Sequence, residues 1–424
     1  MIGFVVKGLL RDRSRSLLPV LMVSAGVFLT VFLYGWMQGV INEFVLTSAR
    51  FDTGFVKVTT RAYEEFADQM PNDLALMDAG RIIDEVKLED HEMIWTPRIK
   101  FGGLLDIPDE KGQTRAQGPV MGMGVNLLES GSPDIEILKL KDALVKGDIP
   151  SKSGQILVSD ELAGKLNLNI GDTATIITST MYASMATYNF TVAGSVNFGI
   201  TPMDRGTIIA DIKDVQSALD MNGCTSEILG YTKDMVYDNK KMKKLAMQFN
   251  EKYSNKDDQF SPVMIPLRDQ GGLAVYMDMG KKFGSIIVGI FVLAMSIVLW
   301  NAGLMNGLRR YGEIGVRLAI GESKSDIYRW MIAEAVVVGF IGSVIGTALG
   351  IAATYYLQVK GIDATAMMQK STVFLANRIR AQVTPVSFII GFLPGLIAPV
   401  IGAVFAGIGI YKRQTAQLFK ELEV

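Results

Sequence analysis

The sequence predicts an α-helical membrane protein with four transmembrane helices and a large mixed α/β extracytoplasmic domain, inserted between the first helix and the second. Charged residues make up 20% of the 424 residues, yet four long runs hold almost none of them. Between the first and second runs lies a long stretch of ordinary composition with strand-like and helix-like patterns. This segregation of apolar from charged residues indicates a membrane part and a water-exposed part.

Four apolar runs are expected to cross the membrane, as residues 17–39, 283–306, 331–357 and 385–411. Each reaches the roughly 20 residues that a helix needs to cross a bilayer, and none shows the polar stripe of a helix buried in a soluble core. The first run follows basic residues, as in a signal peptide, but it is longer than the roughly 7–15 apolar residues of a signal core. Glu334 is the only charge in the third run, where snorkelling or capping is favoured over ion translocation.

The distribution of lysine and arginine predicts that both termini are cytoplasmic. Basic residues concentrate before the first run, in residues 307–330 and in the tail, 412–424, and four spans place these segments on one side of the membrane. Lys281, Lys282 and the basic residues of the outer loop, 358–384, oppose this orientation. The balance still favours a cytoplasmic location for both ends.

Residues 40–282 are expected to form the extracytoplasmic domain. Enrichment in β-branched residues between turn signals predicts strands at 54–60, 155–159, 173–179, 188–196 and 206–211. Helical periodicity predicts helices at 72–88, 160–166 and 237–253, and the Pro/Gly-rich stretch 261–272 is expected to be the exit linker. The bordering spans remain helix-compatible beyond the membrane, either as levers that reach into the domain or as ordinary flexible connections.

Composition excludes several classes of function. A net charge of −1 argues against nucleic-acid binding, which needs a basic face. The single cysteine, Cys224, and the single histidine, His91, cannot build a Cys/His metal cluster, and a catalytic triad would have to use His91. The sequence contains no phosphate loop, G-x-x-x-x-G-K-[ST], so we expect no catalytic residue, no metal site and no cofactor in this chain.

A charged segment, residues 307–330, stands between the second and third apolar runs. Its first part has apolar residues at helical spacing, and Glu313 and Arg317 are spaced to pair across one turn. Gly321 stands where a left-handed residue would end this helix. The segment is either a surface loop that rests on lipid or a docking element for a cytoplasmic partner.

A second helix is predicted directly after the glycine. Ser323 and Asp326 have the spacing of a capping box, and the helix would carry Ile327 straight into the third span. Because a movement imposed on this segment would be transmitted to the span, the docking interpretation is favoured.

These residues belong to a longer resemblance. The stretch EIGVRLAIGESKSDIYRWMIAEAVVVGFIGSVIGTALG, residues 313–350, resembles the signature region of FtsX-like permeases, the MacB and LolC/LolE type of ABC transporter subunit. VVKGLLRDRSRSLLPVLMVSAGVFLTV, residues 5–31, resembles the N-terminal interface helix and first span of that family, and GQILVSDELAGKLNLNIGDTATII, residues 154–177, resembles its exported domain. The order of one span, a large exported domain and three spans extends the resemblance over the chain, without the fused ATPase domain of MacB.

The resemblance implies a permease subunit rather than an enzyme, in the inner membrane of a bacterial cell with residues 40–282 in the periplasm. Its partners would be two copies of a separate ABC ATP-binding subunit, which binds ATP and Mg, and a second permease, either an identical or a sister chain. Residues 1–16 would be a cytoplasmic amphipathic interface helix and residues 307–330 the coupling helix. The residues implied in ATPase coupling are Glu313, Ile314, Gly315, Arg317, Leu318, Ala319, Gly321, Ser323, Lys324, Asp326 and Ile327.

Small residues form stripes on the third and fourth spans. They are Gly339, Gly342, Gly346, Gly350, Gly391 and Gly395. Such stripes allow close contact between helices, and the sequence leaves open whether the contact lies within one chain or between two permeases.

Three kinds of extracytoplasmic work are compatible with this family. The first is release of lipoproteins to a periplasmic carrier, favoured because residues 51–65 resemble the region after the first span of lipoprotein-releasing permeases. The second is MacB-like efflux of periplasmic peptides or toxins, and the third is FtsX-like activation of a cell-wall hydrolase. A rival from another class is a membrane-anchored structural or signalling protein without an ATPase partner.

One stretch of the domain is a candidate for contact with substrate or carrier. Residues 178–190 are apolar and rich in methionine, and Met181, Tyr182 and Met185 would be exposed if they form a hairpin tip. Methionine adapts to varied apolar shapes, as contact with acyl chains or a carrier requires. The alternative is an ordinary buried hairpin.

Overall fold

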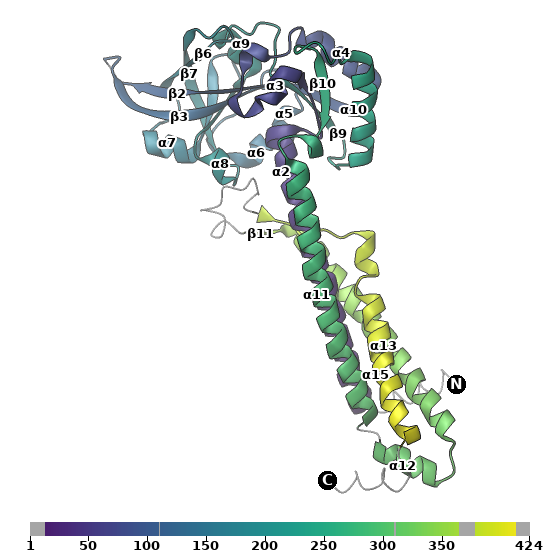
Figure 1. Cartoon of the computed structure of the whole chain (residues 1–424). Helices are drawn as coiled ribbons and strands as arrows, with labels where there is room; N and C mark the ends of the chain where they lie inside the picture. The colour runs from purple at the N-terminus through teal and green to yellow at the C-terminus, as the bar shows by residue number, and fades with distance from the viewer. Residues whose placement is uncertain (1–12, 110, 309–310, 364–377, 413–424) are drawn as a thin grey trace. The chain divides into compact units, whose positions relative to one another are not determined.

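The computed structural model describes residues 13–109, 111–308, 311–363 and 378–412, and the chain divides into two compact units (Figure 1). The membrane-helix unit comprises Met1–Asn42, Asp278–Ile362 and Ile379–Val424. The sheet domain comprises Glu43–Met277 together with Asp363–Arg378. Most of the predicted interface helix, 1–16, and of the tail, 412–424, lies outside the described residues.

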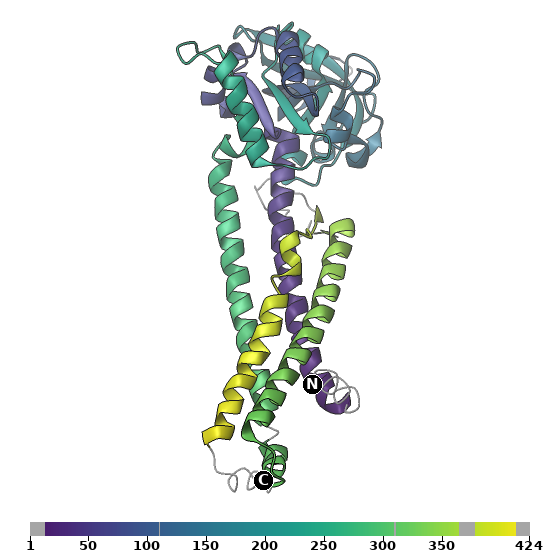
Figure 2. The same ribbon diagram turned by 90° about the vertical axis from the view of Figure 1, so that its right-hand side faces the viewer.

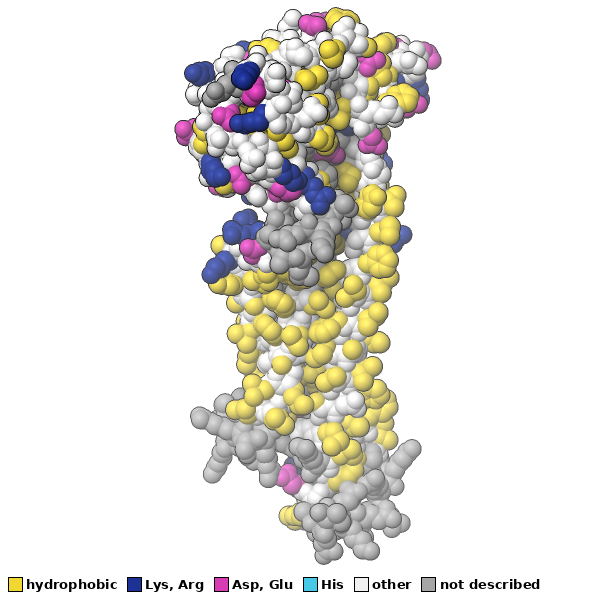
Figure 3. Space-filling view, turned by 90° about the vertical axis from the view of Figure 1, so that its left-hand side faces the viewer, with side chains coloured by type: hydrophobic (Ala, Val, Ile, Leu, Met, Phe, Trp, Pro, Cys, Tyr) yellow, Lys and Arg dark blue, Asp and Glu magenta, His cyan; other side chains and the backbone are white. Residues whose placement is uncertain are grey.

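Four helices of the described residues are long and apolar enough to cross a membrane. They are α2, Arg13–Ser48; α11, Leu273–Leu308; α13, Lys324–Lys360; and α15, Phe392–Lys412, which follows the 3-10 turn η5, Pro385–Phe388. Figure 3 shows hydrophobic side chains along these helices. Together with the α/β sheet domain between the first helix and the second, they confirm the predicted fold class.

Three glycines of α13 allow it to approach α2 closely. A Cβ atom added to Gly342 would lie 2.7 Å from the Cβ atom of Val23, and one added to Gly346 would lie 2.5 Å from the carbonyl oxygen of Ser24. Gly350 makes the same kind of approach one turn further along α13. The two backbones are therefore close enough to exclude any side chain at these positions.

The remaining glycines of the predicted stripes contact the same bundle. A Cβ atom on Gly339 would lie 3.1 Å from the carbonyl oxygen of Leu396 in α15, and both Gly391 and Gly395 pack against Val27 of α2. Helices α13 and α15 lie side by side (Figure 2). All six glycines therefore pack against other helices of the same chain.

We expect Gly346→Ala to lower the free energy of unfolding by about 1–3 kcal/mol, because the methyl group forces α13 and α2 apart. Gly289→Ala in α11 is the matched control, since nothing lies within 4 Å of its added Cβ atom. Helix propensity should make that control neutral or stabilising. Thermal denaturation in detergent measures both variants, and equal effects would show that close packing at Gly346 does not hold the bundle together.

The sheet domain is built on ten strands of the described residues. They are β1, Val56–Thr60; β2, Met93–Pro108; β3, Thr114–Val125; β4, Leu144–Gly147; β5, Gln155–Ser159; β6, Thr173–Ser179; β7, Met185–Val196; β8, Thr207–Asp211; β9, Glu227–Thr232; and β10, Pro262–Pro266. Their order is β10-β1-β9-β2-β3-β8-β5-β7-β4, and β6 pairs with β2 and β7. The long strand β2 joins two halves of the sheet, one on the side of β9 and the other on the side of β3. It pairs with β9 over its first residues and with β3 over the rest.

Helices and turns cover this sheet. The α-helices are α3, Arg61–Glu65; α4, Ala79–Glu89; α5, Asp134–Ile137; α6, Leu140–Ala143; α7, Asp160–Leu166; α8, Thr201–Asp204; α9, Ile212–Ala218; and α10, Asn239–Tyr253. The other turns are the π-helical η1, Ala49–Thr53, and the 3-10 turns η2, Ala67–Gln69, η3, Asn72–Leu74, and η4, Leu267–Asp269. In the outer loop, β11, Ile362–Asp363, pairs with β12, Arg378–Ile379.

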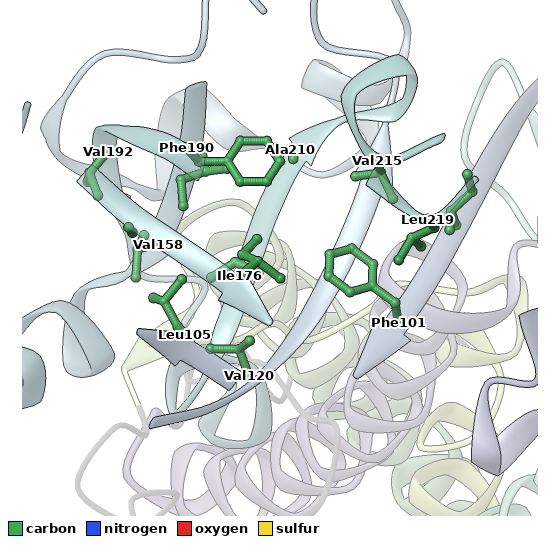
Figure 4. Packing of buried hydrophobic residues seen from close by; sticks show 14 of the residues in the cluster. Phe101, Leu105, Val120, Val158, Ile176, Phe190, Val192, Ala210, Val215 and Leu219 are labelled. Atoms are coloured by element: carbon green, nitrogen blue, oxygen red, sulfur yellow. The ribbon is translucent and has the colours of Figure 1, made fainter. Parts of the chain in front are cut away.

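Two apolar clusters stabilise the halves of the sheet domain. Figure 4 shows the first, in which Phe101, Leu105 and Phe190 pack with branched side chains of β5, β6 and β8. The second gathers around Phe55 and Tyr231 and includes residues from the ends of α2 and α11. The sheet domain therefore buries the ends of two helices that also contain membrane spans.

Two predicted elements of the sheet domain are wrong. The helix predicted at 72–88 is interrupted, because Leu76 and Thr225 exchange backbone hydrogen bonds of 2.9 and 3.0 Å in an isolated bridge. A 3-10 turn, η3, therefore precedes α4. The expected linker, 261–272, contains the edge strand β10, which pairs antiparallel with β1 and has a proline at each end, as edge strands tolerate.

Candidate functional site

The charged segment between α11 and α13 folds into two helices joined by a tight turn. Helix α12, Tyr311–Ala319, comes first, and α13 then begins at Lys324 and continues without interruption through the third span. The described part of the segment therefore has the helix, turn and helix that the sequence predicts.

The turn is fixed by backbone geometry at Gly321, whose φ of +101° is one that side chains disfavour. The Gly321 N–H donates to the carbonyl of Leu318 at 3.1 Å, and the Glu322 N–H donates to that of Arg317 at 3.1 Å. This pair of bonds is the Schellman motif, which satisfies carbonyls at a helix end.

Ser323 caps the start of α13. Its hydroxyl accepts from the Asp326 N–H at 3.1 Å and lies 2.7 Å from the Asp326 carboxylate. The predicted cap is therefore present, although the carboxylate bonds to the serine hydroxyl where a full capping box would bond to the serine N–H.

One face of α12 anchors the segment to the bundle. Tyr311 and Ile314 are buried with Ile327 and Met331 of α13 and with Ala406 of α15. The Tyr311 hydroxyl donates to the carbonyl of Ala406 at 2.6 Å. Helix α12 is therefore packed against the ends of α13 and α15.

The opposite face of α12 is open and partly apolar. Val316 exposes 42% of its surface, and Ile320, in the turn directly after α12, exposes 81%. This face is therefore accessible to lipid or to a protein partner, the two alternatives that the sequence leaves open.

Arg317 forms the best-defined ion pair of this segment. Its Nε lies 2.6 Å from one oxygen of the Glu322 carboxylate and its Nη2 lies 2.7 Å from the other. The predicted pairing of Arg317 with Glu313 is therefore replaced by a pair that spans the turn. Because both side chains are substantially exposed, the pair contributes about 0–1 kcal/mol and serves mainly to orient the turn.

In the structure some of the predicted coupling residues are buried and others are exposed. Ile314, Gly315 and Ile327 are buried, whereas Leu318 and Lys324 are half-buried. The exposed members are Glu313, Arg317, Ala319, Gly321, Ser323 and Asp326. The predicted coupling residues did not include Val316 in α12 or Ile320 in the turn that follows, although both are apolar and lie four residues apart.

The predicted contact residues at the hairpin between β6 and β7 also differ in exposure to solvent. Tyr182 and Met185 expose 73% and 81% of their surfaces, but Met181 is buried in the apolar cluster shown in Figure 4. The exposed alternative thus applies to Tyr182 and Met185 and the buried alternative to Met181, whose N–H bonds to the carbonyl of Leu219 at 2.8 Å. Among the described residues, no group of three His, Cys, Asp or Glu side chains could hold a metal ion.

The membrane helices and the inserted sheet domain define a multi-span membrane protein with a large extramembrane domain. Residues 285–415 match the family model "FtsX-like permease C-terminal", which includes α12 and the last three spans. The chain therefore carries an FtsX-like permease domain, and LolC and MacB proteins are among its homologues.

Three relatives give the extent of the similarity. The lipoprotein-releasing system transmembrane protein LolC of Xylella fastidiosa (strain 9a5c) is 24% identical over 255 residues, which are 58% of this chain and 59% of that protein. The macrolide export ATP-binding/permease protein MacB of Psychrobacter cryohalolentis is 31% identical over 108 residues, 24% of this chain and 16% of that protein. A crystal structure of the periplasmic region of MacB from Actinobacillus actinomycetemcomitans has a TM-score of 0.36 at 13% identity, covering 55% of this chain and 95% of that one. The chain thus spans 59% of the length of the LolC relative.

Two isoleucines test the division of this segment into anchor and surface. Ile314→Ala is expected to lower the free energy of unfolding by about 2–5 kcal/mol, because it leaves a cavity between α12, α13 and α15. Ile320→Ala removes the same atoms from an exposed position and should change stability by less than about 0.5 kcal/mol. Chemical denaturation in detergent compares them, and a large effect of Ile320→Ala would mean that its face is covered within the chain.

Proposed function

We propose that the chain is the permease subunit of an ABC transporter that works by mechanotransmission, coupling ATP hydrolysis by a separate cytoplasmic subunit to work outside the cytoplasm. The observation that carries this proposal is α12 with its turn, because an element that is anchored on one face and open on the other leads directly into a transmembrane helix. The FtsX-like permease domain, which contains this element, supports the same assignment.

The proposed partners follow from this assignment. The assembly would contain a second permease, identical or sister, and two ATP-binding subunits, which bind ATP and Mg. One ATP-binding subunit would dock on the open face of α12 in each permease. The protein would lie in the bacterial inner membrane with both termini cytoplasmic and the sheet domain in the periplasm. The concentration of basic residues in the segments assigned to the cytoplasm supports this orientation.

Continuous helices would transmit the movement. Helix α2 contributes to the membrane-helix unit as far as Asn42 and to the sheet domain from Glu43 onwards. Helix α11 passes in the same way from the sheet domain to the membrane-helix unit between Met277 and Asp278. Because neither passage contains a break in the helix, displacement of a span would reach the sheet domain without a loop to absorb it.

For the work done outside, we propose release of lipoproteins to a periplasmic carrier. The match to LolC extends over 255 residues, whereas the match to MacB from Psychrobacter cryohalolentis extends over 108. Tyr182 and Met185 present exposed apolar surface for an acyl chain or a carrier. MacB-like efflux and FtsX-like activation of a hydrolase are the outcomes against which this proposal is tested.

The docking face is tested by co-purification of the tagged chain from membranes of its native host. Wild type should capture an ABC ATP-binding subunit, and Val316→Asp/Ile320→Asp should reduce the captured amount by about tenfold or more. Burying an unpaired carboxylate costs more than the ~1.4 kcal/mol that corresponds to tenfold. Met247→Asp, at an apolar position of α10 that is 55% exposed, is the matched control and should retain the subunit.

Two outcomes of that experiment would contradict the proposed coupling to an ATP-binding subunit. One is the absence of any ATP-binding subunit in the wild-type preparation. The other is an intact complex after both the apolar substitutions and charge reversal at Glu313 and Asp326.

The proposed substrate is tested by the fate of lipoproteins. Tyr182→Ser/Met185→Ser should slow their release from spheroplasts to a soluble carrier several-fold, because it removes exposed apolar contact area. Phe260→Ser, at another apolar position of the sheet domain that is 53% exposed, is the control. Normal lipoprotein release together with sensitivity to peptides or macrolides would favour efflux, and a cell-separation defect would favour hydrolase activation.

A further inference from the structure

Helix α2 is followed by a π-helical turn that lies within the sheet domain. After Ser48 the chain continues as the π-helical turn η1, which the Gly54 N–H closes by donating to the carbonyl of Ala49 at 2.9 Å. The last carbonyls of a helix lack partners within the helix and carry a partial negative charge. In a buried position they need donors from elsewhere.

Two cationic side chains of strand β2 supply some of these donors. Arg98, fully buried, donates from Nη1 to the carbonyl of Arg50 at 2.8 Å. Lys100 donates from Nζ to the carbonyl of Asp52 at 2.8 Å and lies 2.6 Å from its carboxylate. Cations at the carbonyl end of a helix also complement its dipole.

Two neutral side chains supply the rest. The buried Tyr231 hydroxyl, from β9, donates to the carbonyl of Ala49 at 3.0 Å. The buried Gln270 amide donates to the carbonyl of Thr53 at 3.2 Å and to that of Ile265 at 3.0 Å. Gln270 stands just before α11, so the same set of bonds joins the end of one long helix to the start of the other.

A network of ion pairs keeps Lys100 charged and in place. Glu227 lies 2.9 Å from Lys100 and 3.3 Å from Lys57, and Lys57 lies 2.7 Å from Glu64. Burial alone would lower the pKa of Lys100, but Asp52 and Glu227 outweigh it and raise that pKa. Lys100 therefore remains a charged donor over the physiological pH range.

Lys100 also acts on the carboxylate of the turn itself. The Asp52 side chain is 57% exposed, and the neighbouring Lys100 holds the pKa of its carboxyl below the ordinary value. A carboxylate with a lowered pKa contributes stability at and above neutral pH, and this contribution is lost only as the solution becomes strongly acidic. At neutral pH the contact between η1 and β2 is thus a complete ion pair.

Directional bonds and apolar contacts do different things at this end of α2. Val45 and Ala49 pack in an apolar cluster, and the rings of Phe51 and Phe198 lie 5.0 Å apart. Such contacts resist separation through the area that they bury. The hydrogen bonds to four carbonyls add directional restraints on the rotation and axial position of the helix end.

We propose that Arg98, Lys100, Tyr231 and Gln270 are positioning residues that clamp the outer end of α2 to the sheet, and that movement of the levers enters the sheet domain through this clamp. The proposal rests on the proposed lever function. It assigns the transmission to side-chain bonds on η1 rather than to the covalent connection alone.

The test uses a variant that breaks part of the clamp without leaving a buried charge unpaired. Tyr231→Phe/Gln270→Leu removes the two neutral donors to η1. The matched control, Thr59→Val/Thr60→Val, also removes two buried hydroxyl donors, which bond to carbonyls of Ser226 and Leu74 outside η1. Thermal denaturation should show similar, modest losses of stability for the two variants.

The first readout is hydrogen exchange in the purified full chain in nanodiscs, without any partner. Loss of two hydrogen bonds should speed exchange of the η1 amides by about 10- to 30-fold in the clamp variant and leave it unchanged in the control. Wild-type exchange at η1 in the clamp variant would overturn the proposal, whatever the function of the protein.

The second readout is transmission, measured with the co-purified ATP-binding subunit. Addition of ATP and vanadate should alter exchange in the sheet domain of wild type and control, but not of the clamp variant, which should still hydrolyse ATP. An unaltered response in the clamp variant would show that the force takes another route. A wild type that captures no ATP-binding subunit would refute the proposed function itself, a result that the first readout does not depend on.

Discussion

The continuity of the helices α2, α11 and α13 is the constraint on which the rest of the structure depends, and α2 remains continuous although Pro19 lacks a backbone donor. In hydrocarbon each backbone N–H and C=O must be satisfied within its own segment, which makes helices of these spans. Helices α2 and α11 have 36 residues each and α13 has 37. At about 1.5 Å per residue each is longer than the roughly 30 Å of a hydrocarbon core. Each long helix therefore has at least one end that must be satisfied outside the bilayer.

The chain solves the problem of helix ends in two ways. On α12 the last carbonyls bond to backbone N–H groups around Gly321, so the turn is local and needs no other element. On α2 the last carbonyls bond to Arg98, Lys100, Tyr231 and Gln270, which come from distant parts of the sheet domain. The end of α12 is thus completed by local backbone bonds, whereas the end of α2 is bonded to buried residues of the sheet domain.

Glycines set how the spans pack, and this affects where other subunits can bind. The close approaches at Gly342, Gly346 and Gly350 are used against α2 of the same chain. In contrast, a Cβ atom added to Gly289 of α11 would meet nothing from outside its own helical turn within 4 Å, and α11 carries exposed apolar residues such as Ile290 and Leu293. The glycine stripes therefore explain the internal stability of the bundle and leave other surfaces to lipid or partners.

The sequence by itself determined the features that depend on local composition and spacing. The apolar spans, the stop at Gly321 and the cap at Ser323 are of this kind, because hydropathy and turn chemistry act within a few residues. Tertiary structure alone decided that Ile314 faces inward and Ile320 outward. It also decided the path of strand β2, in which Phe101 occupies the space that a side chain at Gly122 would need. The clamp on η1 is of the second kind too, since a buried carbonyl is satisfied by whichever donor the fold brings near, and that pairing leaves no local pattern in the sequence.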